Sequence, residues 1–421
     1  MIKRRLHPAW IAALVTFFTL VATSGFRAAP SILIVPLHTS FGWSRSSISA
    51  AISINVLVYG LTAPFAAALM DRFGIRRVVM FALMIVGTGA WCTQYINRPW
   101  HLMLLWGFVV GGGTGSMALV FAASIANRWF IKNKGLIIGI LTAASAAGNL
   151  IFLPGLSHLV TRYGWKSVSI TVATGAFLMV PVIFFFLKES PLHAAVKPYG
   201  APDDYQYPEI VHRKAGREAI DTLVRASKVK NFWLLCGSFF VCGLSTSGLI
   251  GTHFIPAAMD HGMVMDTAAS LLALVGVFDV IGTMASGWLT DRVDPVKLLF
   301  FYYFLRGLSL FLLPSILFRS IHPSTLVFVI FYGLDWVATV PPTVILCRRI
   351  LGPQSGTVVY GWVFAFHQIG GSIAALGGAI IHDQLGNYAL AFYAGGGLCL
   401  IASYAVLQIS RDPVPEVVTS R

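Results

Sequence analysis

The stretch "ALMDRFGIRR", residues 68–77, places Asp71 and three basic residues between two long apolar runs. The stretch "GWLTDRVDPVK", residues 287–297, holds the same position between two apolar runs in the second half of the chain. The Asp-Arg pairs of the two stretches lie 220 residues apart, and Pro36 and Pro256 are related by the same offset. An ungapped match of this kind is typical of an internal repeat. The sequence therefore predicts two equivalent halves, each built around a charged turn.

The composition predicts that the apolar runs lie in a lipid bilayer. Of the 421 residues, 57% are hydrophobic and only 11% are charged, whereas a soluble domain carries about 25% charged residues. Twelve segments approach the ~20 residues that a helix needs to cross a membrane: 9–37, 46–70, 76–96, 101–127, 134–160, 166–187, 231–257, 266–290, 296–317, 324–346, 356–382 and 387–409. The first is too long for the core of a secretory signal, about 7–15 residues, so we expect it to be retained. The predicted fold is an all-α membrane protein with twelve transmembrane helices in two pseudo-symmetric six-helix bundles.

The polar region 188–230 separates these bundles. It carries 8 basic and 6 acidic residues in 43 positions, so it is expected to connect an N-terminal bundle, residues 1–187, with a C-terminal bundle, residues 231–421. Its last part, "REAIDTLVRASKVK" (217–230), has apolar residues at helical spacing. This part is interpreted either as an interfacial helix or as a polar linker without fixed structure.

The net charge of +14 is compatible with nucleic-acid binding or with membrane topology. A nucleic-acid-binding surface would need a soluble basic stripe with interleaved aromatic residues, and the sequence offers none. With the N-terminus in the cytoplasm, 23 of the 30 Lys and Arg residues fall on the cytoplasmic side, 5 outside and 2 within helices. This is the positive-inside bias. We therefore expect a multi-pass protein of the plasma membrane, the inner membrane in a bacterium, with both termini cytoplasmic and no nucleic-acid partner.

Enzymatic and metal chemistry have little support in the sequence. The five cysteines form no CxxC pair and no regular spacing, so neither a metal site nor a disulfide framework is expected. No arrangement of a nucleophile with a base stands out. A membrane sensor would need signalling segments, which the tail "SRDPVPEVVTSR" (410–421) does not offer. The chain is expected to be no enzyme and to use no cofactor.

Both charged turns resemble the loop signature of the major facilitator superfamily, a Gly four residues before Asp-Arg and then Gly and basic residues. The second turn keeps Gly287 but has Asp294 where the first has Gly74. "RWFIKNKGLIIGILTAASAAG" (128–148) and "FGWSR" (41–45) look like signatures of the monocarboxylate transporters and their relatives, including the oxalate:formate antiporters. The resemblance implies the major facilitator fold, with the substrate near the membrane midplane between the two bundles.

The resemblance also implies a cytoplasmic gate motif, made of Asp71, Arg72, Arg76, Arg77, Asp291 and Arg292. In the family, the acid of the first turn meets the N-terminal end of a helix in the other half, where the helix dipole favours negative charge. Carried over to Asp71, this contact would latch the cytoplasmic side closed. The alternative is that these residues only mark the border of the membrane.

Four charged residues lie deep within predicted spans: Arg27, Asp279, Arg306 and Asp335. Each costs about 2.5–3.5 kcal/mol at the bilayer centre, so each needs a partner or a function. Arg306 and Asp335 both lie about 10 residues into consecutive antiparallel spans, so they can meet near the midplane. We interpret them as a structural ion pair in preference to a ligand contact. Arg27 and Asp279 belong to different halves, and we assign them to transport because a pair that opens and closes can drive alternation.

Comparison with the resembling families adds candidates for substrate binding. Monocarboxylate transporters carry a Lys on helix one and an Asp four residues before an Arg on helix eight; this chain has Arg27, Asp279 and Thr283 in these regions. Where the antiporter branch uses a Lys on helix eleven, this chain offers His367 and Gln368. The substrate-binding candidates are Arg27, Tyr59, Trp336, His367 and Gln368. For His367 and Trp336, simple packing in the core is the alternative.

These observations predict a proton-linked secondary carrier of small organic anions, in particular monocarboxylates. Asp279 would take up a proton when a carboxylate occupies Arg27, so that the loaded site stays neutral. The alternatives are proton-independent anion exchange and efflux of apolar or cationic compounds. The expected partners are a small organic anion, protons and the lipid bilayer, and the expected oligomeric state is a monomer.

Overall fold

The computed structural model describes residues 7–117, 119–132, 134–202, 204–205, 215–318 and 320–410, apart from some side chains within the helices. Within these ranges the chain folds into helices, and an isolated bridge between Phe130 and Tyr199 is the only β-type pairing. Nine of the described helical segments are long and apolar enough to cross a membrane. A helix satisfies its backbone hydrogen bonds internally, as hydrocarbon requires. The protein is therefore an all-helical, multi-pass membrane protein.

The helices of the first half follow the predicted spans closely. They are α1 Pro8–Phe41, α2 Arg45–Phe73, α3 Ile75–Cys92, α4 Pro99–Leu102, α5 Gly111–Gly115, α6 Leu119–Trp129, α7 Lys134–Tyr163 and α8 Lys166–Phe186, with a π-helical stretch, Met103–Val110, between α4 and α5. The chain leaves α1 through Gly42 with a φ of 68°, and the offset-related Gly262 follows α11 (Gly251–Asp260) with a φ of 83°. Glycine adopts this left-handed conformation without strain, so the repeat extends to the way these helices end.

The helices of the second half are α10 Lys230–Gly243, α11, α12 Met265–Thr290, α13 Pro295–Ile316, α14 Pro323–Asp335, α15 Val340–Leu385 and α16 Ala389–Val406, with a π-helical stretch, Leu244–Ile250, joining α10 to α11. The predicted span 324–346 differs from the structure, because a turn over residues 336–339 separates α14 from α15. Helix α15 then continues through the loop that was expected between residues 346 and 356. The prolines that follow Val340 lie in its first turn, where a missing N–H costs nothing.

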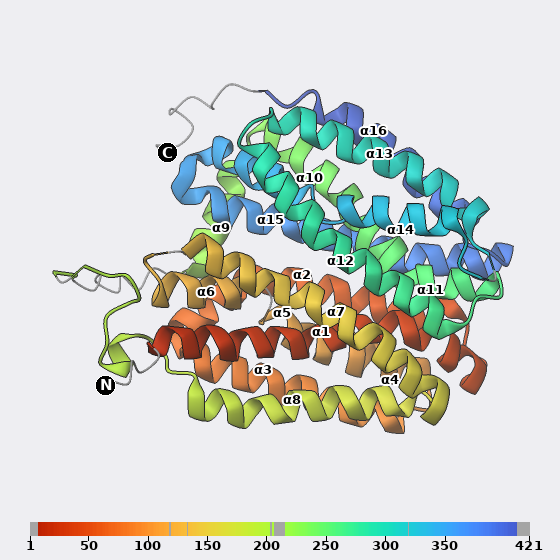
Figure 1. Ribbon diagram of the computed structural model, residues 1–421, viewed down its shortest axis with the longest axis horizontal. Coiled ribbons are helices and arrows are strands. Elements are labelled where there is room, and N and C mark those ends of the chain that lie inside the picture. The colour runs from red at the N-terminus through yellow and green to blue at the C-terminus, as the bar shows by residue number, and fades with distance from the viewer. Residues whose placement is uncertain are drawn as a thin grey trace.

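The two halves lie side by side, with α1 to α8 in red to yellow and α10 to α16 in green to blue (Figure 1). Three helix pairs join them: α2 packs against α15, α7 against α12, and α1 against α11. The second span of the first half thus meets the fifth of the second half, and the fifth meets the second. Such reciprocal contacts are those of a pseudo-two-fold axis between the halves.

The connector ends in a helix, α9 Ala215–Ala226, that contacts both α2 and α15. Ala219 and Ala226 are buried, and the indole of Trp362 in α15 donates to the carbonyl of Ala219 at 2.9 Å. On another face, Ile220 and Val224 are 51% and 52% exposed. The helix expected near the end of the connector is therefore formed, with one face docked on the bundles and an apolar edge left uncovered.

The molecule has two opposite ends, the linker side and the distal side. The linker side carries the connector and the first and last described residues: the ring of His7 contacts Tyr199, and Ser410 is hydrogen-bonded to Asn231. The distal side is the opposite end, where Arg45 begins α2 and α11 ends at Asp260.

Candidate functional site

Arg27 projects from a stretch of α1 that is otherwise buried. Its neighbours one turn away, Thr23, Ser24, Pro30 and Ser31, are all buried, whereas Arg27 itself is exposed. It lies nine residues beyond the exposed Phe18, about two and a half helical turns and thus on the opposite face. The guanidinium is therefore exposed on the side of α1 opposite to Phe18.

Several hydroxyl side chains of α1 are hydrogen-bonded to α1 itself. Thr16, Thr19 and Thr23 are buried, and each donates to a carbonyl of α1 itself, at 2.8, 2.7 and 2.9 Å. Ser31 does the same at 3.0 Å. A hydroxyl group that donates to a carbonyl of its own helix has no hydrogen left to donate to a ligand. In contrast, among the described residues the guanidinium N–H groups of Arg27 form no hydrogen bond.

Arg27 leads into a group of rings that crosses between the halves. Its guanidinium lies 5.2 Å from the ring centre of Tyr59 in α2, and this ring lies 6.4 Å from that of Phe364 in α15. His367, one turn further along α15, stacks nearly parallel on Phe364 at 5.6 Å. The charge of Arg27 is close enough to act on the His367 ring. We call Arg27, Tyr59, Phe364 and His367 the central cluster; it joins α1 and α2 to α15.

The central cluster offers two polar groups that lack protein partners. Among the described residues, Arg27 forms no ion pair and no hydrogen bond, and its guanidinium lies over the ring of Tyr59. The Nδ1 atom of His367 is buried without a hydrogen-bond partner. A buried polar atom of this kind calls for a water or ligand. A guanidinium and an imidazole without partners suit an anion with a second polar group.

Gln368 lies beside the central cluster but mainly serves helix packing. It is 3% exposed, and a Cβ atom on Gly60 would come within 2.4 Å of its side chain. One turn further, Ser53 of α2 and Ser372 of α15 share a hydrogen bond of 2.8 Å between the halves. The structure thus places Gln368 in the tight contact between α2 and α15.

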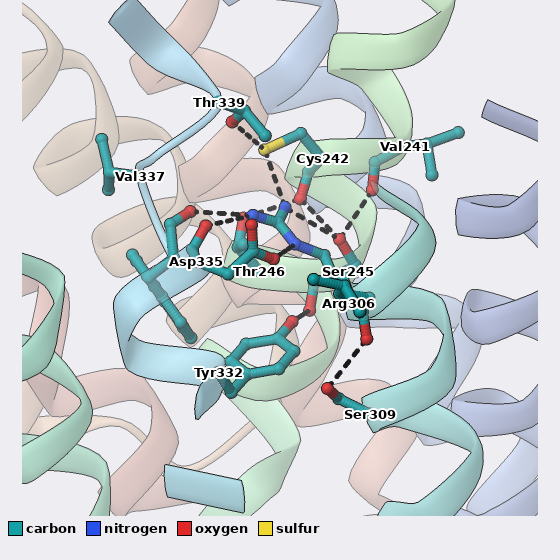
Figure 2. Close-up of polar contacts among 12 residues, drawn as sticks. Val241, Cys242, Ser245, Thr246, Arg306, Ser309, Tyr332, Asp335, Val337 and Thr339 are labelled. Carbon is teal, nitrogen blue, oxygen red and sulfur yellow. Dashed lines mark hydrogen bonds and ion pairs between the residues drawn. The ribbon is translucent and has the colours of Figure 1, made fainter. Parts of the chain in front are cut away.

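Arg306 and Asp335 form a buried ion pair within the second half (Figure 2). The Nε atom of Arg306 donates to Oδ2 of Asp335 at 2.6 Å, and the Arg306 side chain has no exposed surface. Its two remaining nitrogens donate to Sγ of Cys242 at 3.0 Å and to the carbonyls of Asp335 and Trp336 at 2.5 and 3.2 Å. All three nitrogens of the guanidinium are therefore occupied, as suits a structural role.

The same pair holds the break between α14 and α15. The turn over residues 336–339 leaves backbone groups without helical partners, and side chains from other helices bind them. Arg306 binds the carbonyl of Trp336, Ser286 donates to the carbonyl of Ala338 at 2.5 Å, and Asp279 accepts from the N–H of Val337 at 3.1 Å. Unpaired backbone groups are costly in a membrane interior, so these contacts explain how the break persists.

Asp279 belongs to this break and not to the central cluster. Its Oδ1 atom accepts from Thr283 at 3.0 Å as well as from Val337, and the charges of Arg306 and Asp335 lie close enough to act on it. The structure therefore does not bring Arg27 and Asp279 together, contrary to the expectation of a pair across the halves. The group that Asp279 binds outside its own helix is the N–H of Val337, in the same half of the chain.

Trp336 also belongs to the break. Its ring lies edge-on to that of Tyr332 at 5.7 Å, and its carbonyl accepts from Arg306. The structure places it with α13 and α14 and does not bring it to Arg27. These contacts agree with the alternative interpretation, in which Trp336 packs in the core.

The first charged turn lies on the linker side. Arg72 and Arg76 each stack on a phenylalanine ring, at 5.1 and 4.5 Å, and Arg77 is exposed. The side chain of Asp71 lies outside the described part of the structure, so its expected contact with the other half stays a prediction.

The second charged turn follows the end of α12. Arg292 lies 4.2 Å over the ring of Trp288 and donates to the carbonyl of that residue at 3.0 Å, and Asp291 is exposed. These contacts are local, so the gate role of this turn also stays a prediction.

A group of side chains that the sequence did not single out joins the halves on the distal side. Both terminal nitrogens of Arg45 bind the carboxylate of Asp260 at the end of α11, at 2.7 and 2.9 Å, and one also binds the hydroxyl of Tyr388 at 3.2 Å. Asp383 accepts from the N–H groups of Arg45 and Ser46, at 3.2 and 2.9 Å. We call Arg45, Asp260, Asp383 and Tyr388 the distal clasp. Burial raises the pKa of Tyr388 to about 12, against the opposing effect of Arg45, so this phenol stays protonated.

Comparisons with known proteins agree with the fold. The sequence model of the Major Facilitator Superfamily matches residues 12–375. An uncharacterized MFS-type transporter of Bacillus subtilis, YcxA, is 26% identical over 389 residues, covering 90% of each chain. Monocarboxylate transporter 13 of Rattus norvegicus is 25% identical over 411 residues, covering 95% of this chain and 88% of the relative.

Solved structures share the same architecture. A D-xylose-proton symporter superposes with a TM-score of 0.73 at 13% identity, covering 96% of this chain and 98% of the other. A bacterial homologue of the human lysosomal transporter Spinster, inward-facing and occupied, gives 0.70 at 15% identity, covering 94% and 96%. At these identities the likeness concerns the fold alone.

Proposed function

Since the chain belongs to the major facilitator superfamily and is a secondary transporter, we propose that its substrates are small organic anions, with monocarboxylates as the preferred class. The observation that carries the proposal is Arg27, a guanidinium without an acidic partner among the described residues, accessible between the halves. Arginine matches a carboxylate with two parallel hydrogen bonds. The relatives named monocarboxylate transporters support this substrate class.

In the proposed mechanism the carboxylate binds Arg27 and the rest of the substrate lies against the rings of Tyr59 and Phe364. The Nδ1 atom of His367 provides the second polar contact. Because Arg27 and Tyr59 belong to one half and Phe364 and His367 to the other, a bound anion contacts both halves. Binding in such a position biases how the halves move relative to one another.

In this proposal Asp279 couples transport to protons, because it binds the break between α14 and α15. The ionised carboxylate accepts the N–H of Val337, and protonation of the carboxylate weakens this hydrogen bond. The turn between α14 and α15 then loses one of the contacts that hold it. Proton uptake at Asp279 would thus alter the second half at a point next to the ion pair of Arg306, without direct contact with the substrate.

The test is uptake into proteoliposomes that contain the purified protein. Labelled monocarboxylates, dicarboxylates and an organic cation are offered with and without an inward proton gradient. We expect gradient-stimulated uptake of one or more monocarboxylates, lost in Arg27→Gln and kept in the matched surface variant Arg162→Gln. Uptake of the cation alone, or full uptake by Arg27→Gln, would contradict the proposal.

Proton-independent anion exchange is the second candidate, and one observation favours it. Asp279 is bonded within its own half and forms no ion pair with Arg27, so the anion site is complete without this acid. Counterflow at equal pH on both sides separates the two candidates, because exchange proceeds without a gradient. If net uptake then needs an internal anion at every pH, exchange is the function.

A further inference from the structure

A hollow of about 800 Å³ opens on the linker side of the first half, away from the central cluster. Its walls come from the end of α2, the start of α3, the end of α8 and the first residues of the connector. Four basic side chains line it, together with one acid: Arg72, Arg76, Arg77, Lys188 and Glu189. This hollow, which we call the linker-side pocket, has no role in the transport mechanism proposed above.

The pocket is closed on one side by a specific contact between the charged turn and the connector. Oε2 of Glu189 accepts the N–H of Arg76 at 3.2 Å, in the first turn of α3. A Cβ atom on Gly74, which has a φ of 89°, would lie within 2.3 Å of the other Glu189 oxygen. Only glycine adopts this conformation without strain and leaves room for the carboxylate. Two segments that are far apart in the sequence, the charged turn and the start of the connector, thus form this wall together.

The charge in the pocket is unbalanced. The Oε2 atom of Glu189 accepts a backbone N–H, and its Oε1 atom is buried without a hydrogen-bond partner. Among the described residues, none of Arg72, Arg76, Arg77 and Lys188 forms an ion pair. The guanidinium carbon of Arg76 lies over the Phe184 ring, 4.5 Å from its centre. A stacked guanidinium keeps its N–H edges free for an anion. Four cations against one acid favour a ligand with a phosphate or similar anionic group.

The walls also contain apolar surface at the level where two spans end. Phe73 at the end of α2 and Phe184 near the end of α8 line the pocket, and they are 49% and 45% exposed. A soluble anion gains nothing from exposed rings, whereas a lipid places its phosphate among cations and its acyl chains along apolar side chains. The combination therefore fits a membrane lipid better than a free anion.

We propose that the linker-side pocket binds the phosphate group of an anionic phospholipid from the leaflet on that side. The phosphate lies among Arg76, Arg77 and Lys188, and an acyl chain follows Phe184. Because Glu189 and Arg76 tie the connector to α3, an occupied pocket braces the contact between the connector and the first half.

The test measures lipid retention by the full-length protein in detergent, using native mass spectrometry after exchange into phosphatidylglycerol or phosphatidylcholine. The variant is Arg77→Gln with Lys188→Gln, two exposed side chains outside the wall contact. The matched control is Arg162→Gln with Lys166→Gln, which removes the same charge on the distal side. Gel filtration and thermal unfolding establish that all forms are folded.

We expect the wild-type protein and the control to retain phosphatidylglycerol at least about tenfold more tightly than phosphatidylcholine, and the Arg77/Lys188 variant to lose this preference. Equal retention by the variant, or an equal loss in the control, would overturn the proposal. A further arm adds inorganic phosphate: if millimolar phosphate displaces the lipid completely while equal ionic strength from chloride does not, the pocket serves a soluble anion and the lipid assignment is wrong.

Discussion

Arg27 in α1 and Arg306 in α13 carry the same charge within predicted spans, yet their surroundings differ. Arg306 is 1% exposed and uses all three guanidinium nitrogens on Asp335, Cys242 and backbone carbonyls. Arg27 is exposed, and among the described residues it forms no ion pair or hydrogen bond and lies over the face of the Tyr59 ring. A cation whose donors are all occupied cannot bind a ligand without breaking the fold. The comparison therefore separates a structural charge from one that is available to a substrate, although the sequence presents both in the same way.

The largest expected effect concerns the buried pair. Arg306→Met leaves Asp335 without its counter-ion and removes the donor that binds the carbonyl of Trp336 in the break at residues 336–339. Loss of one partner of a buried pair costs about 3–5 kcal/mol, so we expect a large drop in thermal stability in detergent. The double variant Arg306→Met/Asp335→Leu should recover part of this loss, because it leaves no buried charge. A double variant less stable than both single variants would show that the pair is no simple structural bridge.

The second prediction concerns Arg27. Arg27→Gln removes the proposed carboxylate contact, and loss of such a contact costs about 2–5 kcal/mol. We expect transport efficiency to fall about 100-fold or more, while thermal stability changes little because the side chain has no ion-pair partner among the described residues. Parallel uptake and unfolding assays measure both. If stability falls as it does for Arg306→Met, the contrast between the two arginines fails.

The third prediction tests the proton link. Asp279→Asn keeps an oxygen that accepts the N–H of Val337 but cannot change protonation state. We expect a folded carrier whose uptake no longer rises when the external pH is lowered, because the amide cannot take up a proton. Thr283→Val, which removes a neighbouring donor to the same oxygen, is the control that keeps the pH dependence. An unchanged pH profile in Asp279→Asn would assign coupling to another group.

The smallest effect is expected at Tyr59. Tyr59→Leu removes the ring on which Arg27 rests, and a contact of this type contributes about 0.5–1 kcal/mol at an accessible site. We expect KM to rise about two- to fivefold with kcat little changed. A rise of 100-fold would mean that Tyr59 binds substrate directly and does not only position Arg27.

Much of the fold could be predicted because a helix in lipid must be continuous and apolar for a known length. The ungapped offset between the charged turns located the two halves, and the described spans follow the predicted ranges. The break at residues 336–339 was missed since hydropathy there is uninterrupted. Pro341 and Pro342, in the first turn of α15, are the signal that could have indicated a new helix start.

The site was predictable only in part, for a geometric reason. Depth along a span and helical face follow from the sequence, and consecutive antiparallel spans are adjacent, so Arg306 and Asp335 could be paired. The partner of Asp279 depended on which non-consecutive helix packs against α12. Spacing carries no information on that choice, and the structure places Asp279 beside the break between α14 and α15. For the same reason, the sequence did not indicate Asp260 as the partner of Arg45.

The distal clasp has a consequence for the conditions under which the carrier works. Every cycle that opens this end must part Arg45 from Asp260 and withdraw Asp383 from the start of α2. These groups face one compartment only, and the side chain of Asp260 keeps 22% of its surface in contact with it. Dissolved ions weaken partly exposed ion pairs. The salt concentration on one side of the membrane would then set how often the protein opens toward that side. The rate of transport would depend on the salt of that compartment, although the two halves of the protein are related by pseudo-symmetry.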